Sequence, residues 1–319
     1  MMATSKKATG TKKKPASRAK ASKAKASPSK TRRRAVVIAG SRTPFVKAFK
    51  EFMRMDTIAL GVSAVGGLLE RTQIAQDEID AIVWGGVILP AMAPNVGREI
   101  ALDLRLPPSV EGMTVTRACA SGLQAVTLAA AAIERGDADV VIAGGSDSTS
   151  NGELKLPQKW VHTLAPYAFG KPFKPQDVMS VLAQLMPLSD LVPRRPEIAE
   201  RSTGQVMGEA AEEMAGRNGV SREAQDAFAA SSHHRAAKAI SSGRFDREIV
   251  PVTTPSGEVV TTDTLVRADT SVDKLAKLRP VFAKDGTLTA GNSSPLTDGA
   301  AAVLLMSEEK ARALGYTPL

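Results

Sequence analysis

The sequence predicts an α/β fold, in which a layered αβα domain is interrupted by a mainly helical insertion. Between residues 35 and 150, short apolar runs that end at Gly, as buried strands often do, alternate with stretches of helical periodicity. The alternation stops after residue 150, where Pro, Lys and Met become frequent, and it resumes at about residue 287. Because strands that alternate with helices usually form a parallel sheet between two helical layers, we expect such a sheet here.

The sheet is predicted to lie in a domain formed by residues 35–150 and completed by 288–319. Its predicted strands are 35–40, 81–88, 110–116, 138–143 and 300–306. Helices are predicted after the capping residues Asp56 and Asn95, from about Cys119 to Gly136, and from Ser307 to Gly315. In the helix that follows Cys119, the residues expected on the buried face are Leu123, Val126, Ala130 and Ile133.

Residues 151–287 are predicted to form the insertion, a loop domain. One helical pattern covers 203–217, and a second is capped by Ser221 and ends at Gly243. Two short apolar pieces, 248–253 and 258–262, are predicted as strands. We therefore expect the insertion to be mainly helical.

Residues 1–34 are predicted to be a disordered basic arm. They hold thirteen Lys and Arg, no Asp or Glu and almost no large apolar side chains, so they cannot offset the entropy of ordering. The whole chain has 42 Lys and Arg and 33 Asp and Glu, so the +9 net charge belongs to the arm and the remainder carries −4. We interpret the arm as a solubilising leader or as the result of a mis-assigned start codon. Weak, salt-dependent binding of nucleic acid is the alternative.

Cysteine and histidine usage excludes several kinds of site. A single cysteine, Cys119, excludes an internal disulfide and a cysteine-based zinc cluster, and it favours a reducing, cytoplasmic location. His162, predicted to lie in a Pro-rich loop, and His233 and His234, within a predicted helix, are interpreted as solvated or structural residues. We therefore expect no metal, and because no run of eighteen uncharged apolar residues occurs, we expect no membrane span.

Cys119 is the candidate nucleophile. It lies between a predicted strand and the first turn of a helix, in the segment 116–122, Thr-Arg-Ala-Cys-Ala-Ser-Gly. Backbone N–H groups and the helix dipole at such a place favour the thiolate form, and the small neighbours leave space for a substrate. An inert buried cysteine is the alternative, and the immediate context alone does not exclude it.

The segment 113–126 around Cys119 resembles the acyl-cysteine motif of the thiolase family, although Thr116 stands where many members have Asn. Other segments that match this family in its order are 41–45, 143–148, 207–212 and 289–301. Residues 94–99, Pro-Asn-Val-Gly-Arg-Glu, and 277–282, Lys-Leu-Arg-Pro-Val-Phe, look most like the 3-ketoacyl-CoA thiolases, or acetyl-CoA acyltransferases, of fatty-acid β-oxidation complexes.

The resemblance implies thiolytic cleavage of a 3-ketoacyl-CoA to acetyl-CoA and a shortened acyl-CoA, through an acyl-cysteine on Cys119. It also implies that Ala290 and Ser294 line the channel for the pantetheine arm of CoA. CoA is then a substrate, and no further cofactor is expected. Relatives are dimers or tetramers, often with a hydratase–dehydrogenase subunit, so we expect a homodimer or homotetramer and such a partner.

Three elements that thiolases carry towards the C-terminus are absent from the 319 residues. They are an Asn-Glu-Ala-Phe or His-Glu-Ala-Phe segment, a Gly-His-Pro, and a Cys-x-Gly-Gly-Gly loop. The resemblance assigns the activation of the nucleophile to the His and proton transfer to the second Cys. We therefore expect the chain to lack the second α/β half of a thiolase and to show little or no thiolysis by itself.

Two alternatives to an incomplete or split thiolase stay open. One is a non-catalytic CoA-binding remnant, and the other is a nucleic-acid-associated protein that acts through its basic arm. A reading frame directly downstream of Leu319 that encodes the three absent elements would favour the thiolase over the remnant. Loss of retention on DNA after removal of residues 1–34 would favour the third hypothesis, and unchanged retention would exclude it.

Overall fold

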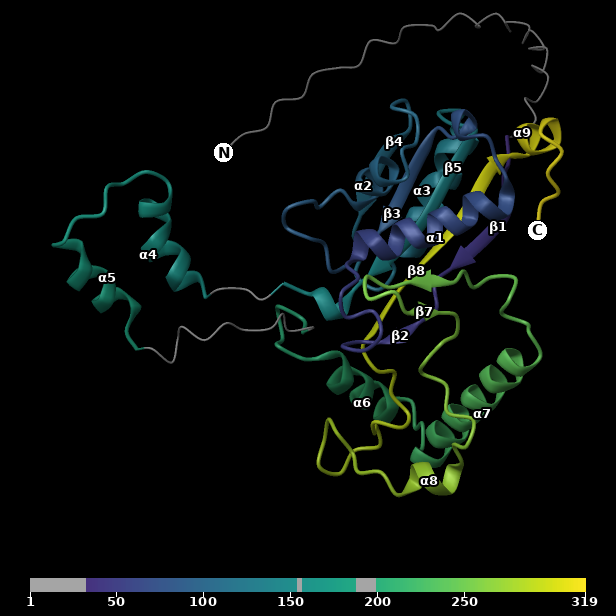
Figure 1. Ribbon diagram of the computed structural model, residues 1–319. Coiled ribbons are helices and arrows are strands. Elements are labelled where there is room, and N and C mark those ends of the chain that lie inside the picture. Colours follow the sequence, from purple (N-terminus) through teal and green to yellow (C-terminus); the bar gives the residue numbers. More distant parts are fainter. Residues whose placement is uncertain (1–32, 154–156, 188–198) are drawn as a thin grey trace, which may run out of the picture. The chain divides into compact units, whose positions relative to one another are not determined.

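A six-stranded sheet forms the centre of the protein (Figure 1). The computed structural model describes residues 33–153, 157–187 and 199–319, so the predicted arm lies outside the described residues except for Arg33 and Arg34. The strands are β1 (Ala35–Arg42), β2 (Val46–Lys47), β3 (Ala81–Gly85), β4 (Glu111–Val115), β5 (Val140–Asp147) and β8 (Thr297–Ser307). The order across the sheet is β1-β8-β5-β3-β4, and β2 pairs with β8.

The sheet is mixed, so our prediction of a parallel sheet was wrong. β3 pairs in parallel with β4 and β5, but β8 is antiparallel to both of its main neighbours, β1 and β5. A helix that follows a strand carries the chain back to the end where the next parallel strand begins. Here the chain leaves the sheet after Asp147 and re-enters it beside Asp147, at Gly299. β8 therefore begins at the end of the sheet where β5 stops, and it must run antiparallel to β5.

Helices cover both faces of the sheet, as predicted. α1 (Thr57–Thr72) and α2 (Val96–Asp103) pack on one face and α3 (Ser121–Arg135) on the other, while α9 (Glu308–Ala313) follows β8. Successive residues of a strand alternate between the two cores: Ile142 lies in the core under α1, whereas Val141 and Ala143 lie in the core under α3.

The buried stripe of α3 contains Ile133, as predicted, but otherwise differs from the predicted one. It consists of Ser121, Ala125, Ala129 and Ile133, while Leu123 is 69% exposed. Val126 and Ala130 are half-buried at the edge of the same core. Small side chains at four-residue spacing let the helix lie close to the sheet, so this stripe faces inward and the larger Leu123 points away.

The insertion is mainly helical, as predicted. Its helices are α4 (Gln158–Ala168), α5 (Asp177–Leu185), α6 (Met207–Arg217), α7 (Arg222–Ser241) and α8 (Val272–Ala276), and its strands are β6 (Val252–Thr253) and β7 (Val259–Val260). As predicted, Ser221 caps α7, by accepting a hydrogen bond from the N–H of Ala224, and the helix ends before Gly243. Gly243 adopts a left-handed conformation. The two predicted strands are only two residues long each.

Helices α4, α5 and α8 were not predicted. α4 contains Pro166 and has no side-chain cap, and both features are typical of a loop in a sequence. His162 therefore lies in a helix rather than in the loop that we predicted, and its ring lies 3.0 Å from Nε2 of Gln158. α8 has only five residues, too few to show helical periodicity.

Arg33 and Arg34, the last two residues of the predicted arm, contact the described body. Arg33 pairs with Asp139, and the carbonyl of Arg34 accepts a hydrogen bond of 2.9 Å from the N–H of Glu308. The domain boundaries that we predicted after residues 150 and 287 stay predictions. In the described part of the chain, no helix is both long and apolar enough to cross a membrane.

Arg42, at the end of β1, joins the sheet to the insertion. Its guanidinium donates to the Asp263 carboxylate at 2.8 and 3.0 Å and to Glu248 at 3.2 Å. The rings of Phe45 and Phe245 lie 4.9 and 5.0 Å from it. Burial opposes the charged form of Arg42, but the hydrogen bonds and charges of Asp263 and Glu248 outweigh burial and raise its pKa.

We predict that Arg42→Ala lowers the free energy of unfolding by roughly 3 kcal/mol, because Asp263 keeps its charge at a mostly buried position without its main partner. Urea unfolding followed by circular dichroism measures this loss. Arg244→Ala is the matched control, since Arg244 pairs with Glu248 on the surface and should change stability by less than about 0.5 kcal/mol. Equal losses in the two variants would contradict the assignment.

Candidate active site

A strained turn between β4 and α3 presents Cys119, whose side chain is exposed. Ala118 has a φ of 47°, in the left-handed region, which costs a residue other than Gly roughly 1–2 kcal/mol. The Ser121 hydroxyl accepts a hydrogen bond of 2.8 Å from the N–H of Arg117 and donates one of 2.6 Å to the carbonyl of Ala118. Ser121 therefore holds the turn in the conformation that exposes the sulfur.

Ser121 is a site residue to which the sequence analysis gave no role. The sequence feature that could have indicated this role is a serine two residues after the cysteine, at the start of the helix, because such hydroxyls often form hydrogen bonds with the nearby backbone. α3 begins at Ser121 and Ala120 is its N-cap, so Cys119 lies between β4 and the first turn of the helix, as predicted. Cys119 is exposed, so it is not buried as our alternative assumed.

The start of α3 touches the end of β3. A Cβ on Gly85 would lie 2.5 Å from the carbonyl carbon and oxygen of Ser121, a distance that no side chain tolerates. Only glycine therefore fits at this end of the strand without moving the helix. This contact fixes the helix start, and with it the sulfur, relative to the sheet.

A cavity of about 530 Å³ opens beside Cys119. The start of α3 forms one wall with Cys119, Gly122 and Val126, and Phe45 and Asp147 contribute from the loop after β1 and the end of β5. The remaining walls are the end of β3 with the residues just after it, the rest of the second half of β5, and the first half of β8. Cys119 therefore faces a space to which four segments distant in the sequence contribute.

Asp147 is the carboxylate of this cavity. One of its oxygens accepts hydrogen bonds of 2.9 and 2.6 Å from the N–H groups of Val87 and Ile88, beyond the end of β3. Burial raises the pKa of Asp147, and these two hydrogen bonds only partly oppose the rise. The carboxylate thus fixes the loop after β3 while its charge opposes folding.

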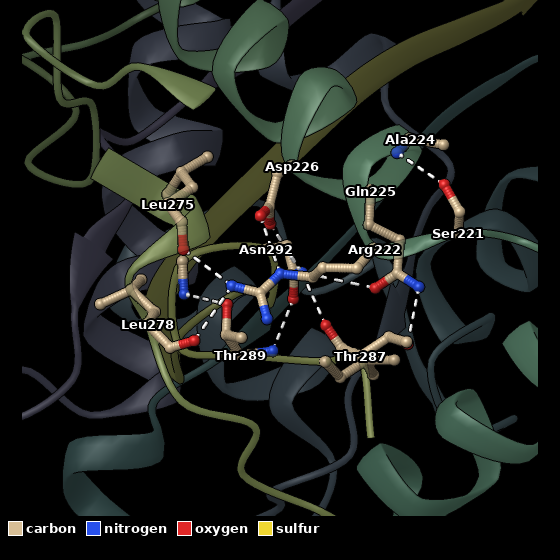
Figure 2. A network of polar contacts seen from close by, with 12 residues as sticks. Ser221, Arg222, Ala224, Gln225, Asp226, Leu275, Leu278, Thr287, Thr289 and Asn292 are labelled. Carbon is tan, nitrogen blue, oxygen red and sulfur yellow. Dashed lines mark hydrogen bonds and ion pairs between the residues drawn. The ribbon is translucent and has the colours of Figure 1, made fainter. Parts of the chain in front are cut away.

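Ala290 and Ser294, the predicted CoA-binding residues, do not line the cavity with Cys119. Both are exposed on the loop that leads into β8, and the same segment reaches the cavity a few residues later, from Thr297 onwards. Figure 2 shows that polar side chains of α7 hold this loop, chiefly through Asn292. The structure thus places Cys119 and the predicted CoA residues on two separate segments. β8 lines the cavity beside Cys119 and follows the loop of Ala290 and Ser294.

Glu212 of α6 also holds this loop. Its carboxylate accepts hydrogen bonds from the N–H and hydroxyl of Thr287, at 2.6 and 2.7 Å, and from the N–H of Leu288, at 3.0 Å. Burial opposes its ionisation, but these hydrogen bonds outweigh burial and lower the pKa of Glu212. The segment 207–212, which the sequence analysis matched to a family motif, therefore acts on the loop before Ala290.

The histidines make structural contacts. His233 accepts a hydrogen bond of 3.2 Å from the N–H of Arg267, and Nε2 of His234 lies 2.7 Å from the carbonyl of Thr270. Both partners lie outside their own helix, so the ring positions are fixed by tertiary packing. Among residues 33–153, 157–187 and 199–319, no group of three or more His, Cys, Asp or Glu is arranged to hold a metal ion.

Comparisons with known proteins identify the class to which this fold and site belong. Residues 35–309 match the family described as thiolase, N-terminal domain. The acetyl-CoA acetyltransferase of Bacillus anthracis superimposes with a TM-score of 0.76 at 33% identity, over 90% of this chain and 68% of that one. Human mitochondrial 3-ketoacyl-CoA thiolase, solved in complex with CoA, gives a TM-score of 0.74 at 27% identity over the same shares.

Curated relatives agree with this class. The 3-ketoacyl-CoA thiolase of Shewanella frigidimarina is 38% identical over 288 residues, and that of Pseudoalteromonas translucida is 40% identical over 285 residues. These alignments cover 90% and 89% of this chain, which spans 65% of the length of each relative. The chain belongs to the thiolase family, and it has the thiolase-like α/β fold that we predicted.

We predict that Asp147→Asn stabilises the protein increasingly as the pH rises above about 4. The folded-state pKa of Asp147 lies above its ordinary value of 3.8, so the protonated form contributes stability that is lost as the pH rises through the folded-state pKa. Asparagine keeps a side-chain oxygen that can accept the hydrogen bonds of Val87 and Ile88, but it does not ionise, so its contribution to stability does not fall as the pH rises. Free energies of unfolding from pH 3 to about 7 measure the difference, and curves that stay parallel would contradict the prediction.

Proposed function

We propose that this chain carries the acyl-accepting half of an acetyl-CoA C-acyltransferase, and that Cys119 is its nucleophile. The observation that carries the proposal is the exposed sulfur on a strained, hydrogen-bonded turn beside a cavity of about 530 Å³, within the range of small-molecule sites. Membership of the thiolase family supports it, as do relatives named 3-ketoacyl-CoA thiolase.

In the proposed reaction the Cys119 thiolate attacks the 3-keto carbon of a 3-ketoacyl-CoA. The bond between C2 and C3 then breaks, acetyl-CoA leaves as its enolate, and the enolate takes up a proton. The thiol of a second CoA gives up its proton and attacks the acyl-cysteine, which releases the shortened acyl-CoA and regenerates the thiolate. Covalent catalysis in this way replaces one difficult cleavage by two easier steps.

Ala290 and Ser294 are the residues that we propose to contact the pantetheine arm of CoA. Both side chains are exposed, whereas Thr289, in the same loop, is buried. The buried residue anchors the backbone, so the exposed residues can contact a ligand from a fixed position. The proposal assigns no role to a metal or to a cofactor other than CoA. It also assigns no proton-transfer residue, because the Gly-His-Pro and Cys-x-Gly-Gly-Gly elements are absent from the sequence.

The wider biochemical setting is proposed from the family resemblance. We propose a homodimer or homotetramer that is located in the cytoplasm and acts in fatty-acid β-oxidation, with a hydratase–dehydrogenase subunit as a further partner. The non-catalytic CoA-binding remnant shares the CoA loop with this proposal but requires no reaction at Cys119. Covalent chemistry at Cys119 therefore separates the two functions.

We predict that the 319-residue chain, incubated with acetyl-CoA, acquires about one acetyl group per molecule on Cys119, because the sulfur is exposed. Intact-mass spectrometry and peptide mapping measure the adduct. Cys119→Ala should carry none, whereas Ser231→Ala, a change within α7, should react like wild type. An adduct that persists in Cys119→Ala would contradict the proposal, as would no adduct on a wild-type chain that iodoacetamide labels readily.

Turnover should be far weaker than acylation in the same chain. General acid–base groups contribute about 10² to 10⁴-fold each, and two of those implied by the resemblance are absent from the sequence. Release of acetyl-CoA from a 3-ketoacyl-CoA, measured by chromatography, should therefore be close to background. Sustained turnover that Cys119→Ala abolishes would show that this chain supplies its own proton-transfer groups.

A further inference from the structure

The loop that carries Ala290 and Ser294 combines exposed side chains with a fixed backbone. Thr289 is fully buried, while Ala290 and Ser294 on either side of the tip are exposed. The N–H of Gly291 donates to the Thr289 hydroxyl at 3.2 Å. Because a preorganised loop loses less entropy when a ligand binds, whatever fixes this backbone contributes to affinity without touching the ligand.

Asn292 is the residue that closes the loop (Figure 2). Its side-chain oxygen accepts a hydrogen bond of 2.7 Å from the N–H of Thr289, and its amide nitrogen lies 3.1 Å from the carbonyl of Thr287. The same nitrogen donates at 3.0 Å to the carboxylate of Asp226 in α7. The amide therefore has one orientation that satisfies every contact. Asp226 selects this orientation, because a carboxylate can only accept hydrogen bonds and so pairs with the NH₂ group of the amide and not with its oxygen.

Asp226 is almost fully buried, with 1% of its side chain exposed, and its second oxygen accepts a hydrogen bond of 2.7 Å from Nε of Arg222. Arg222 in turn donates to the carbonyls of Leu275 and Leu278, at 2.7 and 3.0 Å. A buried carboxylate is costly unless its charge and lone pairs are matched. Here Arg222 matches the charge and leaves the other oxygen free to hold Asn292.

The segment that Arg222 anchors packs against the same loop. A Cβ on Gly291 would lie 2.5 Å from the side chains of both Leu275 and Leu278. One arginine therefore fixes the carboxylate that orients Asn292 and also the leucines that limit the space at Gly291. Both effects act on the backbone between the two predicted CoA contacts.

We propose that Asp226, oriented by Arg222, is a positioning residue for CoA binding that acts through Asn292. The inference rests on the proposed function, because it takes the CoA contacts of Ala290 and Ser294 from it. Asp226 touches no ligand in this proposal. It fixes the amide of Asn292, the amide fixes residues 287–292, and the fixed loop presents its exposed face to the pantetheine arm.

Hydrogen exchange tests the positioning itself without any ligand. In the full chain, Asn292→Ala and Asp226→Asn should each raise amide exchange in residues 287–292 by roughly tenfold, since each removes or misorients the acceptor of the Thr289 N–H. Exchange in α3 should not change. Asp80→Asn is the matched control, because Asp80 accepts hydrogen bonds at the start of β5 and should leave 287–292 protected.

Calorimetric titration with CoA tests the consequence. Each single variant should raise the Kd for CoA by roughly tenfold, and the rate at which iodoacetamide alkylates Cys119 should stay at the wild-type value. In an Asn292→Ala background, Asp226→Asn should have no further effect on the Kd, although it still lowers stability through the loss of the Arg222 pair. Additive effects on the Kd would overturn the proposal, because they would show that Asp226 acts by general destabilisation.

Two further outcomes are decisive. If Asp226→Asn does not fold, the Arg222→Lys variant is tested in its place. Lysine keeps the charge but cannot bridge Asp226 and the two leucine carbonyls. A wild-type Kd for CoA and wild-type amide exchange in that variant would overturn the proposal. If wild type does not bind CoA at millimolar concentration, the proposed CoA site fails. The exchange of residues 287–292 still decides whether Asp226 positions the loop.

Discussion

The reversed strand β8 is the constraint on which both parts of the site depend. It lies between β1 and β5 and is built from residues more than 140 positions after either of them. Its start is fixed by Asp298, which is fully buried and accepts a hydrogen bond of 3.0 Å from the N–H of Ser150. Thr43 donates its N–H to the carbonyl of Ala300 on the other side, at 2.9 Å. The loop of Ala290 and Ser294 precedes this anchored strand, and the cavity of Cys119 lies along it.

Two partly buried arginines attach the insertion to other segments. One attaches it to the sheet, and the other attaches it to the loop that leads into β8. Arg42 matches the charges of Asp263 and Glu248, and Arg222 matches that of Asp226. Each planar guanidinium binds a carboxylate and makes a second kind of contact. Arg42 also packs against aromatic rings, and Arg222 also donates hydrogen bonds to backbone carbonyls. Charged groups at such places give little net stability, but they favour one arrangement of the segments that they join.

The two halves of the site follow the same physical design. At Cys119 the hydroxyl of Ser121 holds a left-handed turn, and at the loop of Ala290 and Ser294 the amide of Asn292 closes the backbone. In both places a short polar side chain fixes the backbone, and exposed neighbours then face solvent. The stability of the surrounding α/β core pays for this local strain. A rigid presentation of this kind suits the reaction that we propose, in which the acyl group must reach one sulfur from a fixed direction.

The sequence by itself determined the fold class, the helical insertion, the caps at Ser221 and Ser307, and Cys119 as the nucleophile candidate, because periodicity, caps and motifs are local in the chain. It did not determine the direction of β8, since that depends on where a long insertion returns. It also missed most of the inward stripe of α3, the helix around Pro166 and the roles of Ser121 and Asp226. Only the tertiary structure decided these, because close packing and hydrogen bonds between distant segments leave no periodic signal in the sequence.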